Sequence, residues 1–191
     1  MVASVDPALP VVFIDTGRLF PETLAYRDHL VVLLGLRDVR TVRPDPADLA
    51  RHDPDGALHR HDPDLCCHIR KTEPLDRALS GMAAWITGRK RYQGGLRRDL
   101  PAIEHDPVSG LFKLNPLAAW TPGDVRAYRR LRGLPPHPLE LRGYASVGCT
   151  TCTTPVRPGE PPRAGRWRGI DKSECGIHLA PVGGLRRRRG G

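Results

Sequence analysis

The chain has 191 residues and a net charge of +9, from 30 Lys and Arg against 21 Asp and Glu. This length is enough for one domain with a hydrophobic core and short for two. No apolar stretch approaches the ~20 residues of a membrane-spanning helix, and residues 1–10 lack the basic start and apolar run of a secretory signal. We therefore expect a cytoplasmic protein with no membrane partner, in which thiols stay reduced.

Part of the positive charge is concentrated at the C-terminus. Residues 180–191 contain the run Arg186 to Arg189 between glycines, a composition typical of a disordered, solvated tail. A nucleic acid is the alternative partner for such a run, but we expect none. The excess positive charge in the rest of the chain favours an anionic ligand without identifying it.

The predicted secondary structure alternates between strands and helices. In chain order, the apolar runs and the helix start and stop signals predict a strand at 11–14, a helix at 22–34, a strand at 39–42, a helix at 69–79, strands at 83–87 and 111–114, and a helix at 121–131. The Pro- and Asp-rich stretch 44–54 interrupts this pattern, and the chain after 135 is expected to be mostly loop. This order predicts an α/β protein with a largely parallel sheet.

Polar residues and glycines follow two of the predicted strands. Asp15, Thr16 and Gly17 come directly after the first strand, and Thr87 and Gly88 end the third. Ligands of parallel sheets bind at the carboxyl ends of strands, so these residues are candidate substrate contacts. An ordinary strand-ending turn is the alternative interpretation for each of them.

Four of the five cysteines occur in two close pairs. In a reducing compartment, such cysteines indicate a metal site or catalysis rather than disulfides. Cys66 and Cys67 are adjacent, and Cys149 and Cys152 form a CxxC motif, which suits zinc or iron–sulfur ligation. Neighbouring side chains on a helix diverge by about 100°, which favours a cluster with several iron corners over one zinc ion. Buried apolar cysteines beside a redox CxxC are the alternative, and these residues alone leave zinc or iron–sulfur open.

The fifth cysteine, Cys175, is a candidate nucleophile. Lys172 and His178 lie close to it in sequence, and nearby cations favour the reactive thiolate. Upstream, Arg163 and Arg166 are three residues apart beside glycines, so both guanidinium groups can bind one sulfate or phosphate. An inert thiol beside a solvated basic surface is the alternative.

Taken together, these stretches resemble the adenylyl-sulfate (APS) and phosphoadenylyl-sulfate (PAPS) reductase family. The matching segments run in family order from about residue 10 to residue 179, which is nearly the whole chain. They are Asp15-Thr16-Gly17 with Phe20-Pro21-Glu22-Thr23, Cys66-Cys67 with Arg70-Lys71, Trp85-Ile86-Thr87-Gly88, Gln93, Lys113-x-Asn115-Pro116-Leu117, Cys149-x-x-Cys152, Arg163-x-Gly165-Arg166-Trp167 and Glu174-Cys175-Gly176-x-His178. The combination of Cys-Cys, CxxC and the last motif is very specific.

The resemblance implies an adenine nucleotide alpha-hydrolase-like (PP-loop) fold, with a parallel sheet, flanking helices and a loop-rich C-terminal segment. The domain would cover residues 1–179. The four paired cysteines would ligate a 4Fe-4S cluster, the mark of the branch that prefers APS. Cys175 would attack the sulfate sulfur and expel AMP, and thioredoxin or a similar dithiol would then release sulfite from the Cys S-sulfonate, a step of sulfate assimilation.

The resemblance also implies a set of substrate contacts. Lys71 would lie between the cluster and the substrate, Arg163 and Arg166 would hold sulfate and phosphate oxygens, and His178 would lie near the nucleophile. The full set of expected substrate-binding residues is Asp15, Thr16, Gly17, Lys71, Thr87, Gly88, Arg163, Arg166, Lys172 and His178. Homo-oligomer formation is left open.

The sequence departs from the family pattern in two places. Lys90 stands where family members usually carry Arg, which keeps the charge but loses the bidentate fork. The family fold also begins with a strand, a Ser- and Gly-rich phosphate loop and a helix, and no such loop precedes Val11. We therefore expect a domain lacking its first strand, loop and helix. A catalytically impaired fragment, or a non-catalytic iron–sulfur or zinc protein on the same scaffold, is the alternative function.

Overall fold

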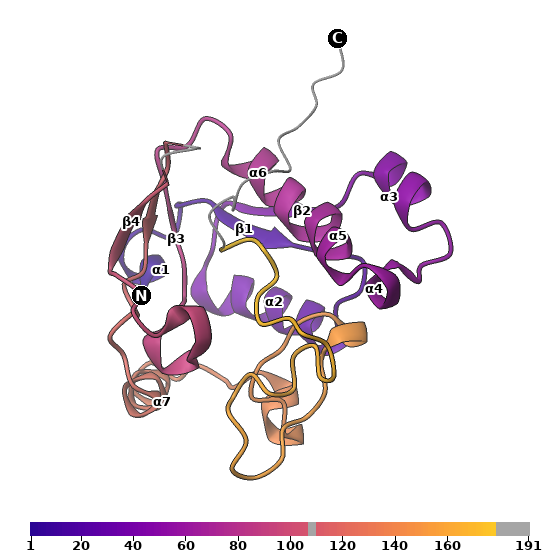
Figure 1. The fold of residues 1–191 in the computed structure, drawn as a ribbon. Coiled ribbons are helices and arrows are strands. Elements are labelled where there is room, and N and C mark those ends of the chain that lie inside the picture. Colours follow the sequence, from indigo (N-terminus) through magenta and orange to yellow (C-terminus); the bar gives the residue numbers. More distant parts are fainter. Residues whose placement is uncertain (107–109, 179–191) are drawn as a thin grey trace.

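Two small β-sheets and the helices around them make up the fold (Figure 1). The structure is a computed structural model that describes residues 1–106 and 110–178, so the tail expected at 180–191 lies outside the described residues. Figure 1 shows α2 on one side of the first sheet and α5 and α6 on the other. The prediction of an α/β fold is confirmed.

The first sheet is a parallel pair joined by a helix. After a short helix α1 (Val2–Val5), strand β1 (Val11–Ile14) pairs in parallel with β2 (Val39–Val42). Helix α2 (Pro21–Leu34) connects them, with proline at its start, and Gly35 ends it in the left-handed conformation at φ 60°. All three predicted elements are confirmed within one residue.

The segment between β2 and the second sheet is helical almost throughout. It consists of α3 (Pro46–His52), α4 (Leu58–His61), α5 (Pro63–Cys67), a π-helical turn (His68–Thr72) and α6 (Glu73–Leu79). The helix predicted at 69–79 therefore forms and is preceded by α5. Helix α3 lies in the stretch that the sequence analysis treated as an interruption, and the Asp45 carboxylate caps it by accepting from the amide of Ala47.

The second sheet is mixed. Strand β3 (Ala84–Ile86) pairs in parallel with β5 (Phe112–Leu114), and β4 (Ile103–His105) pairs antiparallel with the other edge of β5. The strands predicted at 83–87 and 111–114 are confirmed, whereas β4 was not predicted. Among the described residues the two sheets share no strand, so the expected parallel pairing is divided between them.

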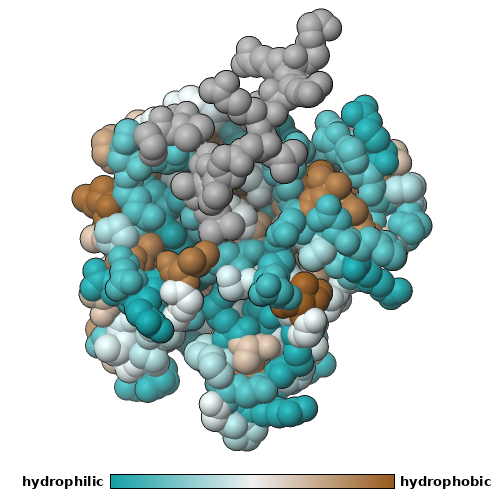
Figure 2. All heavy atoms as spheres, in the orientation of Figure 1, coloured by the Kyte–Doolittle hydropathy of each residue, from teal (hydrophilic) through white to brown (hydrophobic). Residues whose placement is uncertain are grey.

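The C-terminal part begins with a capped helix and continues as loops. In α7 (Pro122–Leu131), Thr121 and Asp124 form a reciprocal capping box. Single 3-10 turns at Pro138–Arg142 and Thr150–Cys152 follow, as expected for a loop-rich segment. No helix in the described part of the chain is long and apolar enough to span a membrane. The face in Figure 2 is mostly hydrophilic, with small separate hydrophobic groups.

A buried asparagine ties the second sheet to the loops around it. Asn115 is 1% exposed, and its side-chain oxygen accepts from Thr87 Oγ1 at 2.5 Å and Arg89 Nη2 at 3.1 Å. Its side-chain nitrogen donates to the Pro101 carbonyl at 3.0 Å and to Glu104 Oε1 at 2.6 Å. Every hydrogen-bonding atom of this amide is therefore used, and the network fixes the turn after β3 against β4.

We expect the Asn115→Ala variant to lose about 3 kcal/mol of unfolding free energy, because several buried partners would be left unsatisfied. Urea denaturation followed by tryptophan fluorescence would measure this loss. Arg98→Ala, at an exposed position nearby, is the control and should change stability by less than about 0.5 kcal/mol. Equal stability of the two variants would contradict the role of this network.

Candidate functional site

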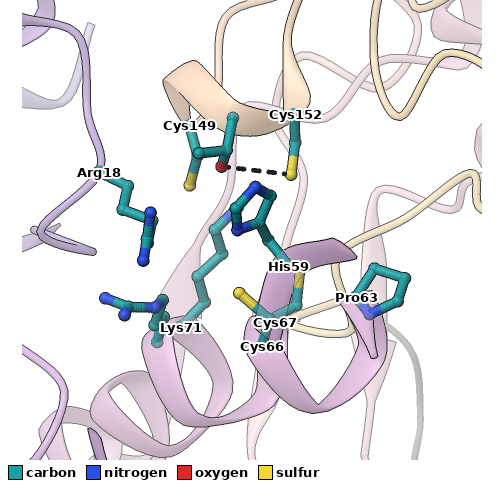
Figure 3. A pocket seen from close by; sticks show the side chains of 10 residues that line it. Arg18, His59, Pro63, Cys66, Cys67, Lys71, Cys149 and Cys152 are labelled. Atoms are coloured by element: carbon teal, nitrogen blue, oxygen red, sulfur yellow. Dashed lines mark hydrogen bonds between the residues drawn. The ribbon is translucent and has the colours of Figure 1, made fainter. Parts of the chain in front are cut away.

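The structure brings the two cysteine pairs together around one cavity (Figure 3). Cys66 and Cys67 end α5 and are both buried. Cys149 is buried and Cys152 is half-buried, and they flank the short 3-10 turn on the opposite side. Two pairs separated by 81 intervening residues thus meet, with all four thiols free.

The CxxC loop is fixed to the segment that follows β1. Leu19 and Cys149 form an isolated antiparallel bridge, and the Thr150 amide donates to the Arg18 carbonyl at 2.8 Å. The hydroxyl of Thr16, which is 1% exposed, lies 3.3 Å from Cys149 Sγ. The carboxyl end of β1 therefore positions the second cysteine pair.

Asp15 and Gly17 shape the same turn. The Asp15 carboxylate accepts from the Gly17 amide at 3.0 Å and from Arg43 Nε at 3.0 Å. Gly17 has φ +71°, and a Cβ there would lie 3.6 Å from Arg70 Nη1, which donates to the Thr16 carbonyl at 2.8 Å. Asp15, Thr16 and Gly17, which were expected to contact substrate, thus lie beside the cysteine cavity. They form the turn after β1, and the Thr16 carbonyl accepts a hydrogen bond from Arg70.

A buried carboxylate that the sequence analysis did not single out anchors this region. The side chain of Asp53 is fully buried and accepts from Arg70 Nη2 at 2.5 Å, Arg18 Nη2 at 3.4 Å and the Leu58 amide at 2.8 Å. Burial alone would raise its pKa, but these hydrogen bonds and the two charges outweigh burial and hold the pKa of Asp53 below its ordinary value. Asp53 is therefore the counter-ion of both arginines.

The protonation of the cysteine pair depends on what fills the cavity. Burial raises the pKa of Cys66 and raises that of Cys67 to about 11, so the free thiols are protonated at neutral pH. Burial alone would lower the pKa of Lys71, but the nearby Cys149, Cys175 and Cys67 outweigh it and raise the pKa. Lys71 thus remains a buried cation beside thiols that would lose their protons to a metal.

The donors around the cavity are four thiols. Among the described residues, no group of three or more His, Cys, Asp or Glu side chains is placed to hold a metal ion. Three buried nitrogens with no hydrogen-bond partner belong to residues that line the cavity: Arg18 Nε, His59 Nδ1 and Arg70 Nε. Four thiols spaced around a cavity that also faces cations and unused N–H groups suit an anionic iron–sulfur cluster.

The segment that carries Cys175 is held by a buried ion-pair network. Glu174 is 6% exposed, and Arg97 binds it with two hydrogen bonds, at 2.5 Å from Nε and 2.8 Å from Nη2. Arg163 Nη2 lies 3.2 Å from the same carboxylate and donates to the Ser173 carbonyl at 2.8 Å. The ion pairs of Glu174 therefore fix the backbone directly before Cys175, while Cys175 itself stays partly exposed.

The same segment packs against the helix of the cysteine pair. Gly176 has φ +89°, and a Cβ there would lie 3.3 Å from Thr72 Oγ1, so this position favours glycine. Lys172 Nζ pairs with Asp64 on α5. These contacts bring Cys175 to the end of the helix that contains Cys67 and Lys71.

Three of the expected anion contacts surround one tryptophan. Trp167 is 2% exposed and has φ 48°, an uncommon conformation for a bulky residue. Its ring lies 4.5 Å from the Arg166 guanidinium, 5.8 Å from that of Arg163 and 5.7 Å from Lys172 Nζ. The buried ring thus gathers three cations that are spread over ten residues of loop.

Of the remaining expected contacts, His178 lines a second cavity, and Thr87 and Gly88 lie in the turn after β3. His178 stacks on Trp85 with ring centroids 5.7 Å apart. Thr87 is engaged by Asn115, and the Gly88 carbonyl accepts from Lys90 Nζ at 2.7 Å. The cavity, of about 170 Å³, is lined chiefly by Arg89, Arg97, Glu104, Glu174 and His178. Arg97 was not singled out by the sequence analysis.

Comparison with known proteins assigns the family. The model of the phosphoadenosine phosphosulfate reductase domain matches residues 1–155. The chain belongs to this family. Two relatives named adenosine 5'-phosphosulfate reductase, from Mesorhizobium japonicum and a Chelativorans species, are 49% and 51% identical to it. Each match covers 94% of this chain, and 70% and 72% of the respective relative.

Solved structures agree with this assignment. A phosphoadenylyl-sulfate reductase from Candida auris, in a phosphate complex, superposes with a TM-score of 0.68 at 28% identity, covering 80% of this chain and 74% of that one. An FMN adenylyltransferase from Candida glabrata, at 18% identity and a TM-score of 0.56, shares the fold. The resemblance to the reductase family and the PP-loop-like fold class are both confirmed.

The environment of His178 predicts a pH-dependent stability. Burial, and then the charges of Arg89, Arg97, Lys113 and Arg163, lower its pKa to about 2. The unfolded chain binds a proton on this residue below about pH 6.5, whereas the folded chain does not. Above about pH 6.5, His178 is neutral in both states and does not reduce the unfolding free energy. As the pH falls below this value, proton binding favours the unfolded chain, and the unfolding free energy decreases.

We expect the unfolding free energy to decrease by up to about 1.4 kcal/mol for each pH unit below pH ~6.5 through His178. His178→Phe keeps a ring against Trp85 and should remove this part of the slope. Urea titrations of both proteins at a series of pH values would measure the difference. Identical slopes would contradict a buried, neutral His178.

Proposed function

We propose that this protein is an APS reductase that converts adenosine 5'-phosphosulfate to sulfite and AMP in sulfate assimilation. The observation that supports this most strongly is the packing of the Cys175 segment against the helix of the cysteine pair, through Gly176 and Thr72. The partly exposed thiol there interacts electrostatically with Lys71 and Arg163. Relatives at about half identity carry the name of this activity.

The first step is a nucleophilic substitution at sulfur. The Cys175 thiolate attacks the sulfur atom of the sulfate group, and the bond from this sulfur to the bridging oxygen of the phosphate breaks. The bonding electron pair leaves with AMP, and Cys175 becomes an S-sulfonate. Because negative charge collects on the transferring group and on the leaving phosphate, fixed cations lower the barrier.

The cations around Cys175 have distinct proposed roles. Arg163 and Arg166 bind the sulfate and phosphate oxygens, since both guanidinium groups lie over the Trp167 ring and Arg163 interacts electrostatically with Cys175. Lys71, buried between the cysteine cavity and Cys175, stabilises the transferring group from the other side. Lys172 lies beside the Trp167 ring, and His178 lines the second cavity.

The second step needs a dithiol reductant, for which we propose thioredoxin or a similar protein. One thiolate of the reductant attacks Sγ of the Cys175 sulfonate, and sulfite leaves with the electron pair of the S–S bond. The second thiol of the reductant then attacks the mixed disulfide and restores Cys175. The two electrons come from the dithiol, which becomes a disulfide. Five free cysteines suit a reducing compartment, and so we propose a cytoplasmic location.

We propose a 4Fe-4S cluster as the cofactor, held by Cys66, Cys67, Cys149 and Cys152. When bound, such a cluster supplies redox capacity and a strong local field. Around it, Arg70 fixes the turn after β1 through the Thr16 carbonyl, and Lys71 balances the negative charge of the thiolates. In both proposed steps, bonds form and break at Cys175 Sγ and at the sulfate sulfur, outside the cysteine cavity.

Protein purified without oxygen should contain about four irons and four sulfides per chain, as in a 4Fe-4S cluster. Cys66→Ala and Cys149→Ala should lose most of the iron, because each removes one thiolate ligand. Cys175→Ala is the matched control and should retain it. Iron and sulfide analysis with visible absorption measures the outcome. Zinc in place of iron would contradict the cluster.

The iron-loaded protein incubated with APS in the absence of a reductant should gain the mass of one sulfonate group on Cys175. Peptide mass spectrometry would locate the adduct, and subsequent addition of thioredoxin should remove it and release sulfite. Arg163→Ala should form the adduct at least 100-fold more slowly, because a cation at the reacting group is lost. A fully loaded protein without adduct would favour a non-catalytic iron–sulfur protein.

A further inference from the structure

Two side chains that no step above uses point unpaired nitrogens at the cysteine cavity. Arg18 Nε and His59 Nδ1 are enclosed and have no hydrogen-bond partner, and both residues line the cavity together with the four cysteines. Buried N–H groups are nearly always paired in folded proteins. With Arg70 Nε, three such exceptions belong to residues that line one cavity, which indicates a missing acceptor rather than separate defects.

The guanidinium of Arg18 is fixed from its far end. Its Nη2 donates to the Gly56 carbonyl at 2.5 Å and to Asp53 at 3.4 Å. Gly56 has φ +72°, and a Cβ there would lie only 2.8 Å from Arg18 Nη2, so the turn leaves room for this contact. With Nη2 anchored in this way, Nε remains on the cavity side, and Figure 3 shows Arg18 reaching toward the cysteines.

His59 approaches the cavity from another element. It lies on α4, directly before the helix that carries Cys66 and Cys67. In Figure 3 its ring lies between the two cysteine pairs. Its neighbours on the same helix, Arg60 and His61, are exposed. Only one position of this basic run therefore faces the thiols.

Sulfur atoms of a bound cluster supply the missing acceptors. Thiolate and sulfide sulfurs accept N–H hydrogen bonds, and such bonds tune cluster potential and retention. We propose that Arg18 Nε and His59 Nδ1 are positioning residues that donate hydrogen bonds to sulfur atoms of the iron–sulfur centre. This inference rests on the proposed cluster and adds two residues that are not ligands.

Resonance Raman spectroscopy of the anaerobically purified protein tests these donors directly. N–H···S bonds make the Fe–S stretching bands sensitive to exchange of H₂O for D₂O. We expect a deuterium shift in the wild-type protein and a smaller one in His59→Phe, which keeps a ring without N–H, and in Arg18→Lys, which keeps the charge without Nε. Both variants should release iron to a chelator about 10-fold faster. The controls His61→Phe and Arg60→Lys should match wild type.

Three outcomes would overturn the inference. One is a loaded wild-type protein whose Fe–S bands do not respond to D₂O, a result that does not depend on any variant folding. Another is wild-type deuterium shifts in both loaded variants. The third is a control that changes as much as its partner. Wild-type protein without iron would instead refute the proposed cofactor itself, and iron analysis distinguishes that failure from the others.

Discussion

The buried contact of Arg70 with Asp53 and with the Thr16 carbonyl joins three parts of the chain. It connects the end of β1, the α3–α4 loop and the helix of the cysteine pair. An ion pair in such a position gains little over a hydrophobic contact of similar size, but breaking it leaves a buried charge and costs several kcal/mol. The main effect of the Arg70–Asp53 pair is therefore to fix the relative positions of these three segments. The turn after β1 also holds the CxxC loop through the Leu19–Cys149 bridge. Arg70, together with Arg18, which also binds Asp53, therefore links the two cysteine pairs.

A second network positions Cys175, the proposed nucleophile. Glu174 accepts from Arg97 and Arg163, and so the residue before Cys175 is tied both to the turns after β3 and to the loop of Trp167. Glu174 compensates part of the charge of these two arginines, while Arg166 and Lys172 lie beside the Trp167 ring. The cations near the Cys175 segment outnumber the two carboxylates that pair with them, which are Glu174 and Asp64. Binding of a phosphosulfate would add charge where positive charge is in excess.

Local signals predicted most of the elements. The apolar β-branched run at 11–14 and the capping residues Thr121 and Asp124 encode β1 and the start of α7 within a few residues. Strand β4 was missed because Ile-Glu-His has no distinctive pattern and becomes a strand only by pairing with β5. Helix α3 was missed because its Asp45-Pro46 start was interpreted as a loop. Asp53 and Arg97 were missed for another reason: their partners lie up to 77 positions away, so no local pattern identifies them.

The adjacency of Cys66 and Cys67 acquires a meaning from the cations that follow them. Each cysteine has a cation four residues later on the same helix, Arg70 for the first and Lys71 for the second. Because neighbouring residues on a helix are rotated by about 100°, these two pairs face different surroundings. The Cys66–Arg70 side meets Asp53 and the turn after β1, whereas the Cys67–Lys71 side meets Lys172 and Cys175. Two consecutive cysteines would therefore anchor the proposed cluster to the scaffold on one side and place it beside Cys175, the proposed nucleophile, on the other. A CxxC pair with both thiols on one face would not achieve this.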